Sequence, residues 1–109
     1  MTETNPASVT IGILGSGQLG RMLAIAAAQL GLRTHVFAPD AGNSPAGDIA
    51  HRATTASYDD TAALAIFAAD VDVITSEFEN VPATIMDLLA NICPVSPGRT
   101  ALHTAQHRI

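Results

Sequence analysis

Short apolar runs closed by glycine, proline or polar residues recur along this chain and predict buried β-strands. Residues 10–14, 34–38 and 71–75 are the clearest of these runs, and shorter strands are expected within 49–55 and at 93–96. Apolar residues between the runs recur at helical spacing instead. The pattern therefore alternates between strands and helices along the chain.

The first predicted helix follows a glycine-rich turn and ends at Gly31, a residue type that commonly terminates helices. Apolar residues three and four positions apart share one side of a helix, and we expect that side to be buried. The residues concerned are Leu19, Met22, Leu23, Ala26 and Leu30.

The later helices have boundaries that the sequence also suggests. Asp59 or Asp60 is expected to cap a helix that ends at Ala69. Another helix has Pro82 in its first turn, where proline is favoured, and continues to about Asn91. Strands and helices in this alternation are typical of an α/β fold with a doubly wound, mainly parallel, Rossmann-like sheet.

The length of 109 residues suits one domain, spanning residues 1–109. Residues 1–8 are expected to form a flexible tail, and residues 42–48, rich in Gly, Asn, Ser and Pro, a surface loop. Residues 100–109 favour a helix that has only just begun. We therefore expect them to start the connection to a further domain and the chain to be part of a longer protein.

Composition excludes several functions. The formal net charge is −5, and the chain has no lysine and only five scattered arginines, so DNA and RNA are not expected partners. A phosphate-binding P-loop requires a lysine and is excluded. No apolar run approaches the roughly 20 residues that span a bilayer, so a soluble, cytoplasmic protein is expected. The single Cys93 is expected to be a small buried residue without disulfide or metal.

The glycines Gly15, Gly17 and Gly20 fit the pattern G-x-G-x-x-G between a strand and a helix. The first permits a tight turn, the second a close approach of a ligand, and the third close packing of helix on strand. The helix N-terminus can then receive an anion or a polar ligand. A dinucleotide such as NAD is one alternative, with Asp40 as the ribose-binding acid, although Pro39 places Asp40 outside the strand. A purely structural turn is another.

The segment SEFENVP at residues 76–82 follows a predicted strand directly. Ligands of open α/β sheets bind beyond the carboxyl ends of the strands, where the glycine turn also lies. Glu77 and Glu79 share one side of an extended segment. Either acid can accept hydrogen bonds from a ligand amine or a ribose hydroxyl, or it can stabilise the N-terminus of the following helix.

Other polar residues are weaker candidates for a site. His35 lies within a strand pattern and is expected to be a packed or edge residue. The remaining histidines, His51, His103 and His107, show no metal-ligand spacing. Arg21 is expected either to face solvent or to contact a ligand, since it directly follows the glycine turn.

Three motifs together resemble a known family. They are GSGQLGRM at 15–22, EFENVP at 77–82, and SP at 96–97 with AQHR at 105–108. In this order and spacing they are similar to 5-(carboxyamino)imidazole ribonucleotide synthase, the ATPase subunit of phosphoribosylaminoimidazole carboxylase, in the ATP-grasp superfamily. The resemblance extends over residues 11–109.

The resemblance implies a role in purine biosynthesis, with ATP, Mg²⁺ and bicarbonate used to carboxylate 5-aminoimidazole ribonucleotide. It implies a pre-ATP-grasp domain in which Gln18, Leu19 and the glycine turn meet the ribonucleotide and Glu77 binds near its reactive amine. Arg108 would contact ATP. It also implies a homodimer, and a chain of this length alone is expected to be inactive because the ATP-grasp domains would be missing.

Four positions depart from the family pattern: Ser16, Ala38, Ser76 and His107, where Gly, Asp, Tyr and Asp are common. Two enzyme classes remain as alternatives. One is the related formate-dependent glycinamide ribonucleotide transformylase, which generally has Glu at the position of Gln18. The other is the NAD-binding domain of an oxidoreductase. A stand-alone nucleotide-sensing module is a non-enzymatic third.

Overall fold

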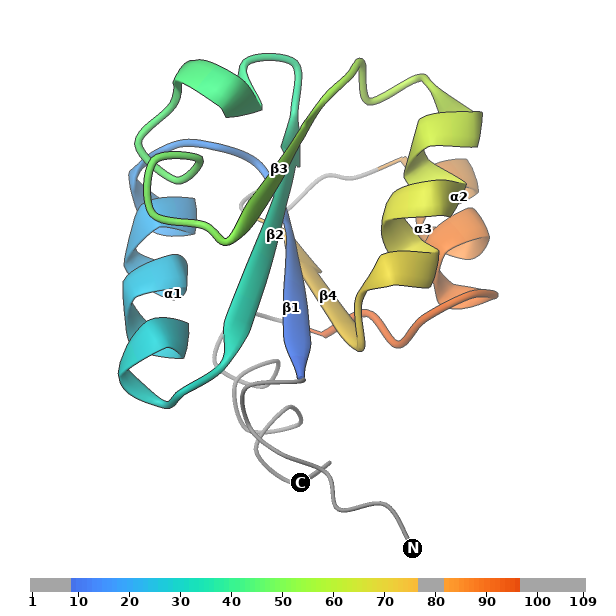
Figure 1. The fold of residues 1–109 in the computed structure, drawn as a ribbon. Coiled ribbons are helices and arrows are strands. Elements are labelled where there is room, and N and C mark those ends of the chain that lie inside the picture. Colours follow the sequence, from blue (N-terminus) through green and yellow to red (C-terminus); the bar gives the residue numbers. More distant parts are fainter. Residues whose placement is uncertain (1–8, 77–81, 97–109) are drawn as a thin grey trace, which may run out of the picture.

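The computed structural model describes residues 9–76 and 82–96, which form a parallel sheet with helices on both faces (Figure 1). In chain order the elements are β1 (Thr10–Leu14), α1 (Gln18–Gln29), β2 (Arg33–Ala38), the 3-10 helix η2 (Ala41–Asn43), β3 (Arg52–Thr55), α2 (Thr61–Asp70), β4 (Val73–Ser76) and α3 (Ala83–Ala90). The predicted α/β class is confirmed.

The four strands are all parallel and lie in the order β3-β2-β1-β4. In the centre of the sheet, Leu14 of β1 pairs with Phe37 of β2 and with Ser76 of β4. The carboxyl ends of these three strands therefore meet at one edge, which is where ligands bind in open α/β sheets.

Each face of the sheet packs against its own helices. Figure 1 shows α1 on one face and α2 with α3 on the other, as in a doubly wound sheet. Ile11, Ile13 and Val36 belong to the core beneath α1. Leu14, Phe37 and Phe67 belong to the core beneath α2 and α3. Each strand contributes side chains to both cores, because successive residues of a strand point to opposite faces of the sheet.

The buried side of α1 differs from the prediction. Leu19, Met22 and Leu30 are 49%, 63% and 39% exposed, and Leu23 and Ala26 are only partly buried. The fully buried helix residues are instead the small ones, Gly20, Ala24 and Ala27. Small side chains let the helix backbone lie close to the sheet, and the larger apolar residues are then left toward the outside. Periodicity located the helix but selected the wrong face.

Two strand boundaries also differ from the prediction. Val71 is the C-cap residue of α2, and β4 begins at Val73 rather than at residue 71. The expected strand at 93–96 is reduced to one bridge, Ile74 to Val95. Pro82 precedes α3 as its cap residue instead of lying inside its first turn. These differences are of one or two residues at the ends of elements, where local sequence patterns are least decisive.

The predicted cap of α2 and the predicted burial of Cys93 are confirmed. Of the two candidate acids, Asp60 is the cap, and its Oδ1 accepts a hydrogen bond from the Ala63 amide at 3.0 Å. The Cys93 side chain is 4% exposed. In the part of the chain that the structure describes, no helix is both long and apolar enough to cross a bilayer.

Candidate functional site

The glycine turn connects β1 to α1 at the carboxyl edge of the sheet. Gly15 has a φ of 123°, a conformation that residues with a Cβ rarely adopt. Its amide donates to the Phe37 carbonyl at 3.0 Å, which ties the turn to the end of β2. Gly20, in the first turn of α1, is buried. The positive φ of Gly15 suits a tight turn, and the roles assigned to Gly17 and Gly20 stay predictions.

The N-terminus of α1 is suited to a polar ligand. Gly17 occupies the cap position, no side chain in the described residues caps the helix, and its first turn contains no acid. Capping groups normally satisfy amides at this end, and the helix dipole favours negative charge there. Gln18 and Leu19 form the first exposed residues of the helix, and Arg21 is exposed beside them. The two side chains predicted to bind substrate, Gln18 and Leu19, are thus exposed at the carboxyl edge of the sheet.

A second loop, residues 40–50, packs against the glycine turn, which the sequence did not indicate. The Ala46 amide donates to the Ser16 carbonyl at 3.3 Å. The Ser16 hydroxyl donates to Asp40 Oδ1 at 2.5 Å. Glycine in place of Ser16 could not make the second bond. This departure from the family pattern therefore adds a contact between the turn and the end of β2.

Asp40 was the residue on which the NAD alternative depended. It lies beyond the end of β2, and its carboxylate is engaged by Ser16 of the glycine turn. The last residue of the strand, where a ribose-binding acid would be expected, is Ala38. The geometry therefore gives the NAD alternative no additional support.

The acidic segment begins where β4 ends, next to the glycine turn. Ser76, the residue before Glu77, pairs with Leu14, the residue before Gly15. The strand ends that lead into the two predicted binding segments are therefore neighbours. Glu77 and Glu79 themselves lie outside the described residues, as do Arg108 and His107.

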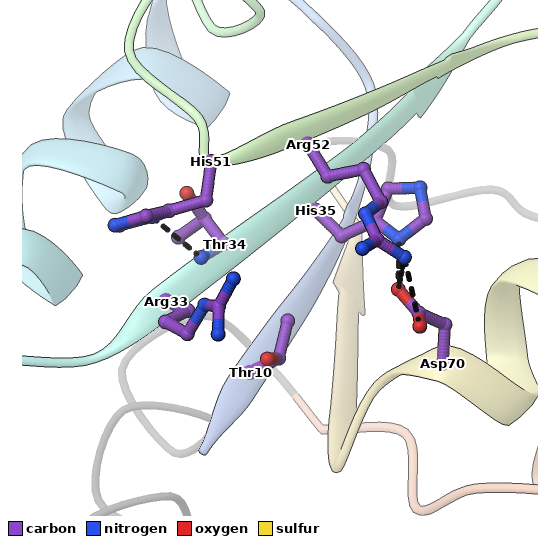
Figure 2. A pocket seen from close by; sticks show the side chains of 7 residues that line it. All are labelled: Thr10, Arg33, Thr34, His35, His51, Arg52 and Asp70. Carbon is purple, nitrogen blue, oxygen red and sulfur yellow. Dashed lines mark hydrogen bonds and ion pairs between the residues drawn. The ribbon is translucent and has the colours of Figure 1, made fainter. Parts of the chain in front are cut away.

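A hollow of about 100 Å³ lies at the opposite, amino edge of the sheet (Figure 2). The residues that line it are Thr10, Arg33, Thr34, His35, His51, Arg52 and Asp70. None was predicted as a site residue. They come from three strands, from His51 just before β3 and from the end of α2, and only the strand register brings them together.

His35 is buried against this hollow and is fully hydrogen-bonded. Its Nδ1 lies 2.9 Å from Asp70 Oδ2, and its Nε2 lies 2.6 Å from Thr54 Oγ1. The ring also meets Phe67 edge-on at 4.9 Å between centroids. Burial lowers the pKa of His35 below its ordinary value, although the hydrogen bond that its ring donates to the Asp70 carboxylate opposes this shift. The packed role expected for His35 is confirmed.

The buried His35 predicts a loss of stability in mild acid. Its pKa is lower when folded than when unfolded, so the unfolded chain takes up a proton first as the pH falls. The midpoint of urea denaturation should therefore decrease as the pH falls from 7.5 through about 6.5 toward the folded-state pKa. His35→Gln should show a weaker pH dependence over this range. An equal slope in both proteins would assign the effect to other groups.

Among the described residues, no group of three His, Cys, Asp or Glu side chains is arranged to hold a metal ion. A Mg²⁺ site is therefore not found in residues 9–76 and 82–96.

Comparisons with known proteins agree on one family. The chain matches the family model of the ribonucleotide synthetase preATP-grasp domain over residues 8–106. The N5-carboxyaminoimidazole ribonucleotide synthase of Brucella melitensis is 52% identical over 98% of this chain. The N5-carboxyaminoimidazole synthetase of Staphylococcus aureus, solved with ADP, superimposes on 86% of the chain with a TM-score of 0.75 and 37% identity.

A third relative was solved with a substrate bound. It is the synthase of Aspergillus clavatus in complex with ADP and 5-aminoimidazole ribonucleotide, 34% identical over 90% of the chain with a TM-score of 0.72. The chain spans 29% of the Brucella protein and 25% and 26% of the two solved chains. These matches favour neither the transformylase nor the oxidoreductase alternative. The chain belongs to the ribonucleotide synthetase preATP-grasp domain family.

Proposed function

We propose that this chain is the ribonucleotide-binding domain of an ATP-dependent carbon–nitrogen ligase. The complete enzyme would carboxylate 5-aminoimidazole ribonucleotide with bicarbonate in purine biosynthesis. The observation that carries this proposal is that the ends of β1 and β4 are neighbours, with Leu14 beside Ser76. The chain in which they meet is 52% identical to an N5-carboxyaminoimidazole ribonucleotide synthase. That adjacency brings the starts of the two binding segments to one edge.

In this proposal each segment has a separate task. The N-terminus of α1 and the Gln18 side chain hold the polar part of the ribonucleotide, with Leu19 in contact beside them. Glu77 accepts a hydrogen bond from the exocyclic amine. A carboxylate in that position orients the amine for attack and can help to manage the proton that it loses. Gly15, Gly17 and Gly20 keep the turn narrow enough for the ligand to approach.

ATP and Mg²⁺ would be held mainly by parts of the enzyme beyond this chain. The described residues offer no set of metal ligands, and the chain contains no lysine to bind phosphates. Arg108 is the residue proposed to reach ATP, because an arginine stays charged and donates several hydrogen bonds. The same proposal includes a cytoplasmic homodimer whose preATP-grasp domain is followed by ATP-grasp domains.

The test uses the complete enzyme that contains this domain. Its ATP hydrolysis should be stimulated by 5-aminoimidazole ribonucleotide, and Glu77→Ala should raise the KM for that ribonucleotide by about tenfold, the loss expected for one hydrogen bond to a charged group. Asp87→Ala, an exposed acid of α3, is the matched control and should leave the KM unchanged.

Two results would contradict the proposal. Unchanged kinetics in Glu77→Ala would remove Glu77 from the site. Stimulation by glycinamide ribonucleotide with formate, in place of aminoimidazole ribonucleotide, would assign the enzyme to the related transformylases. The 109-residue chain alone should show no ATP turnover and little NAD binding by calorimetry.

A further inference from the structure

We propose that the amino edge of the sheet contains a second ligand site, which binds the phosphoryl group of a small metabolite or of inorganic phosphate between Arg33 and Arg52. The site is the hollow of about 100 Å³ described above. It lies at the edge where the strands begin, whereas the glycine turn lies where they end. The two ligands would therefore occupy opposite edges of the sheet.

The register of the strands places both arginines on one face. Thr10 of β1 pairs with Arg33 of β2, and His35 of β2 pairs with Arg52 of β3. Arg33 and His35 are two residues apart and so point to the same side of the sheet. Figure 2 shows Thr10, Arg33 and Arg52 around one hollow, with Asp70 beyond Arg52. A ligand there meets two guanidinium groups and one hydroxyl.

The charges of the hollow favour an anion. Among the described residues that line the hollow, Asp70 is the one carboxylate, and both of its oxygens lie 3.1 Å from Arg52 Nη1. Its Oδ2 also meets His35. Arg33, in contrast, makes no side-chain hydrogen bond or ion pair to another described residue. Within the described part of the chain, the Arg33 guanidinium therefore keeps all of its donors, and the Arg52 guanidinium keeps the donors that Asp70 does not use.

A phosphoryl group fits this arrangement better than a single carboxylate. It carries nearly two negative charges and three acceptor oxygens at neutral pH, enough to engage both arginines and the Thr10 hydroxyl. Arginine pairs with such groups through two parallel hydrogen bonds. These two arginines are brought together in a protein whose formal net charge is −5, so the hollow differs from the average surface.

An adjoining hollow of about 390 Å³ provides room for an organic group. It shares Arg33 and His51 with the first hollow and is otherwise lined by Ala28, Gly31 and Leu32. The C-terminal end of α1 borders it, and the partial negative charge there disfavours an anion. The phosphoryl group is therefore assigned to the arginine side and the carbon skeleton of a metabolite to the α1 side.

The experiment follows backbone amide shifts of the 109-residue protein during titration with inorganic phosphate and, separately, with ribose 5-phosphate. Both ligands should move the amides of Thr34, His51 and Arg52, and sodium chloride at matched ionic strength should not. Tighter binding of ribose 5-phosphate would assign the site to a phosphorylated metabolite. Equal affinities would assign it to phosphate. Shifts confined to the glycine turn, or equal shifts with chloride, would overturn the proposal.

Three substitutions test the role of charge. Arg33→Gln and Arg52→Gln should each weaken phosphate binding by about tenfold, the loss expected for a charged hydrogen bond. Asp70→Asn should strengthen phosphate binding, because it removes the negative charge of Asp70 and still offers His35 an acceptor oxygen. Arg21→Gln, an exposed arginine of α1, is the matched control. A thermal melt verifies that each variant is folded. The proposal would be overturned if phosphate binding did not weaken in the two arginine variants and strengthen in Asp70→Asn.

Discussion

Replacing Phe67 by alanine should lower the free energy of unfolding by about 3–5 kcal/mol, the usual loss for a buried phenylalanine. Phe67 is 1% exposed in the core between α2 and the sheet. Its ring lies 5.3 Å from that of Phe37 and 4.9 Å from that of His35. Truncation would leave a cavity that these rigid neighbours on the sheet cannot fill. Urea denaturation monitored by circular dichroism measures the effect.

Ile66→Ala is the matched control for Phe67→Ala. Ile66 precedes Phe67 on α2 but is 73% exposed, so its truncation removes little buried surface. Alanine also has the higher helix propensity, and the change in stability should stay within about 0.5 kcal/mol. A similar loss in both variants would mean that helix α2, and not the core beneath it, determines stability.

Phe67 can lie close to β1 because Gly12 has no side chain. A Cβ added at Gly12 would come within 2.7 Å of Phe67 Cζ and 2.9 Å of Val71 Cγ2. Gly12→Ala should therefore destabilise the protein through crowding. Combined with Phe67→Leu, which shortens the side chain, its cost should be smaller than in the wild type, since residues in contact do not behave additively. Strict additivity would show that the two residues do not share this space.

Replacing Gly47 by alanine should lower the free energy of unfolding by about 3 kcal/mol, through a steric clash that the loop cannot relieve without opening. A Cβ at Gly47 would overlap the Ala41 carbonyl oxygen, and it would come within 2.8 Å of Ser44 Oγ. The loop is closed by the bond from the Gly47 amide to Ser44 Oγ at 3.0 Å and by the bond from Ser44 Oγ to Ala41 O at 3.0 Å. In Gly47→Ala these two hydrogen bonds should be lost together.

Gly47→Ala should also change the contact between the loop and the glycine turn. The Ala46 amide, one residue earlier, donates to the Ser16 carbonyl. In Gly47→Ala the Ala46 amide should therefore exchange with solvent faster, and the amide shifts of Ser16 and Gly17 should change. This links loop 40–50 to the proposed ribonucleotide site, although the loop contributes none of the residues predicted to bind the ribonucleotide.

Gly42→Ala is the matched control within the same loop. A Cβ at Gly42 would meet only Thr55 Oγ1, at 3.3 Å, which accepts a hydrogen bond from the Gly42 amide at 3.1 Å. Because Thr55 is exposed at the end of its strand, a shift of a few tenths of an ångström can relieve this contact. Its cost should be about 0.5 kcal/mol or less, with no change at Ser16. Equal losses in the two glycine variants would contradict the proposed clash and indicate a general need for glycine flexibility in the loop.

Local signals in the sequence predicted most of the fold correctly. The apolar run before Gly15 and the glycine at 31 define β1 and the end of α1, because strands, turns and helix ends depend on residues close in sequence. Asp60 likewise caps α2 through a contact three residues away. Predictions were wrong where large apolar residues were taken as the buried ones, as with Leu19 and Met22 of α1.

The sequence by itself determined the alternation of strands and helices, the place and shape of the glycine turn, and the family. Only the tertiary structure decided that the β1 and β4 ends are neighbours, that Ser16 bonds to Asp40, and that Arg33 and Arg52 face one hollow. The physical reason is distance along the chain. These contacts join residues 19 to 62 positions apart, and they form only when the order and register of the parallel strands have been fixed by packing both faces of the sheet.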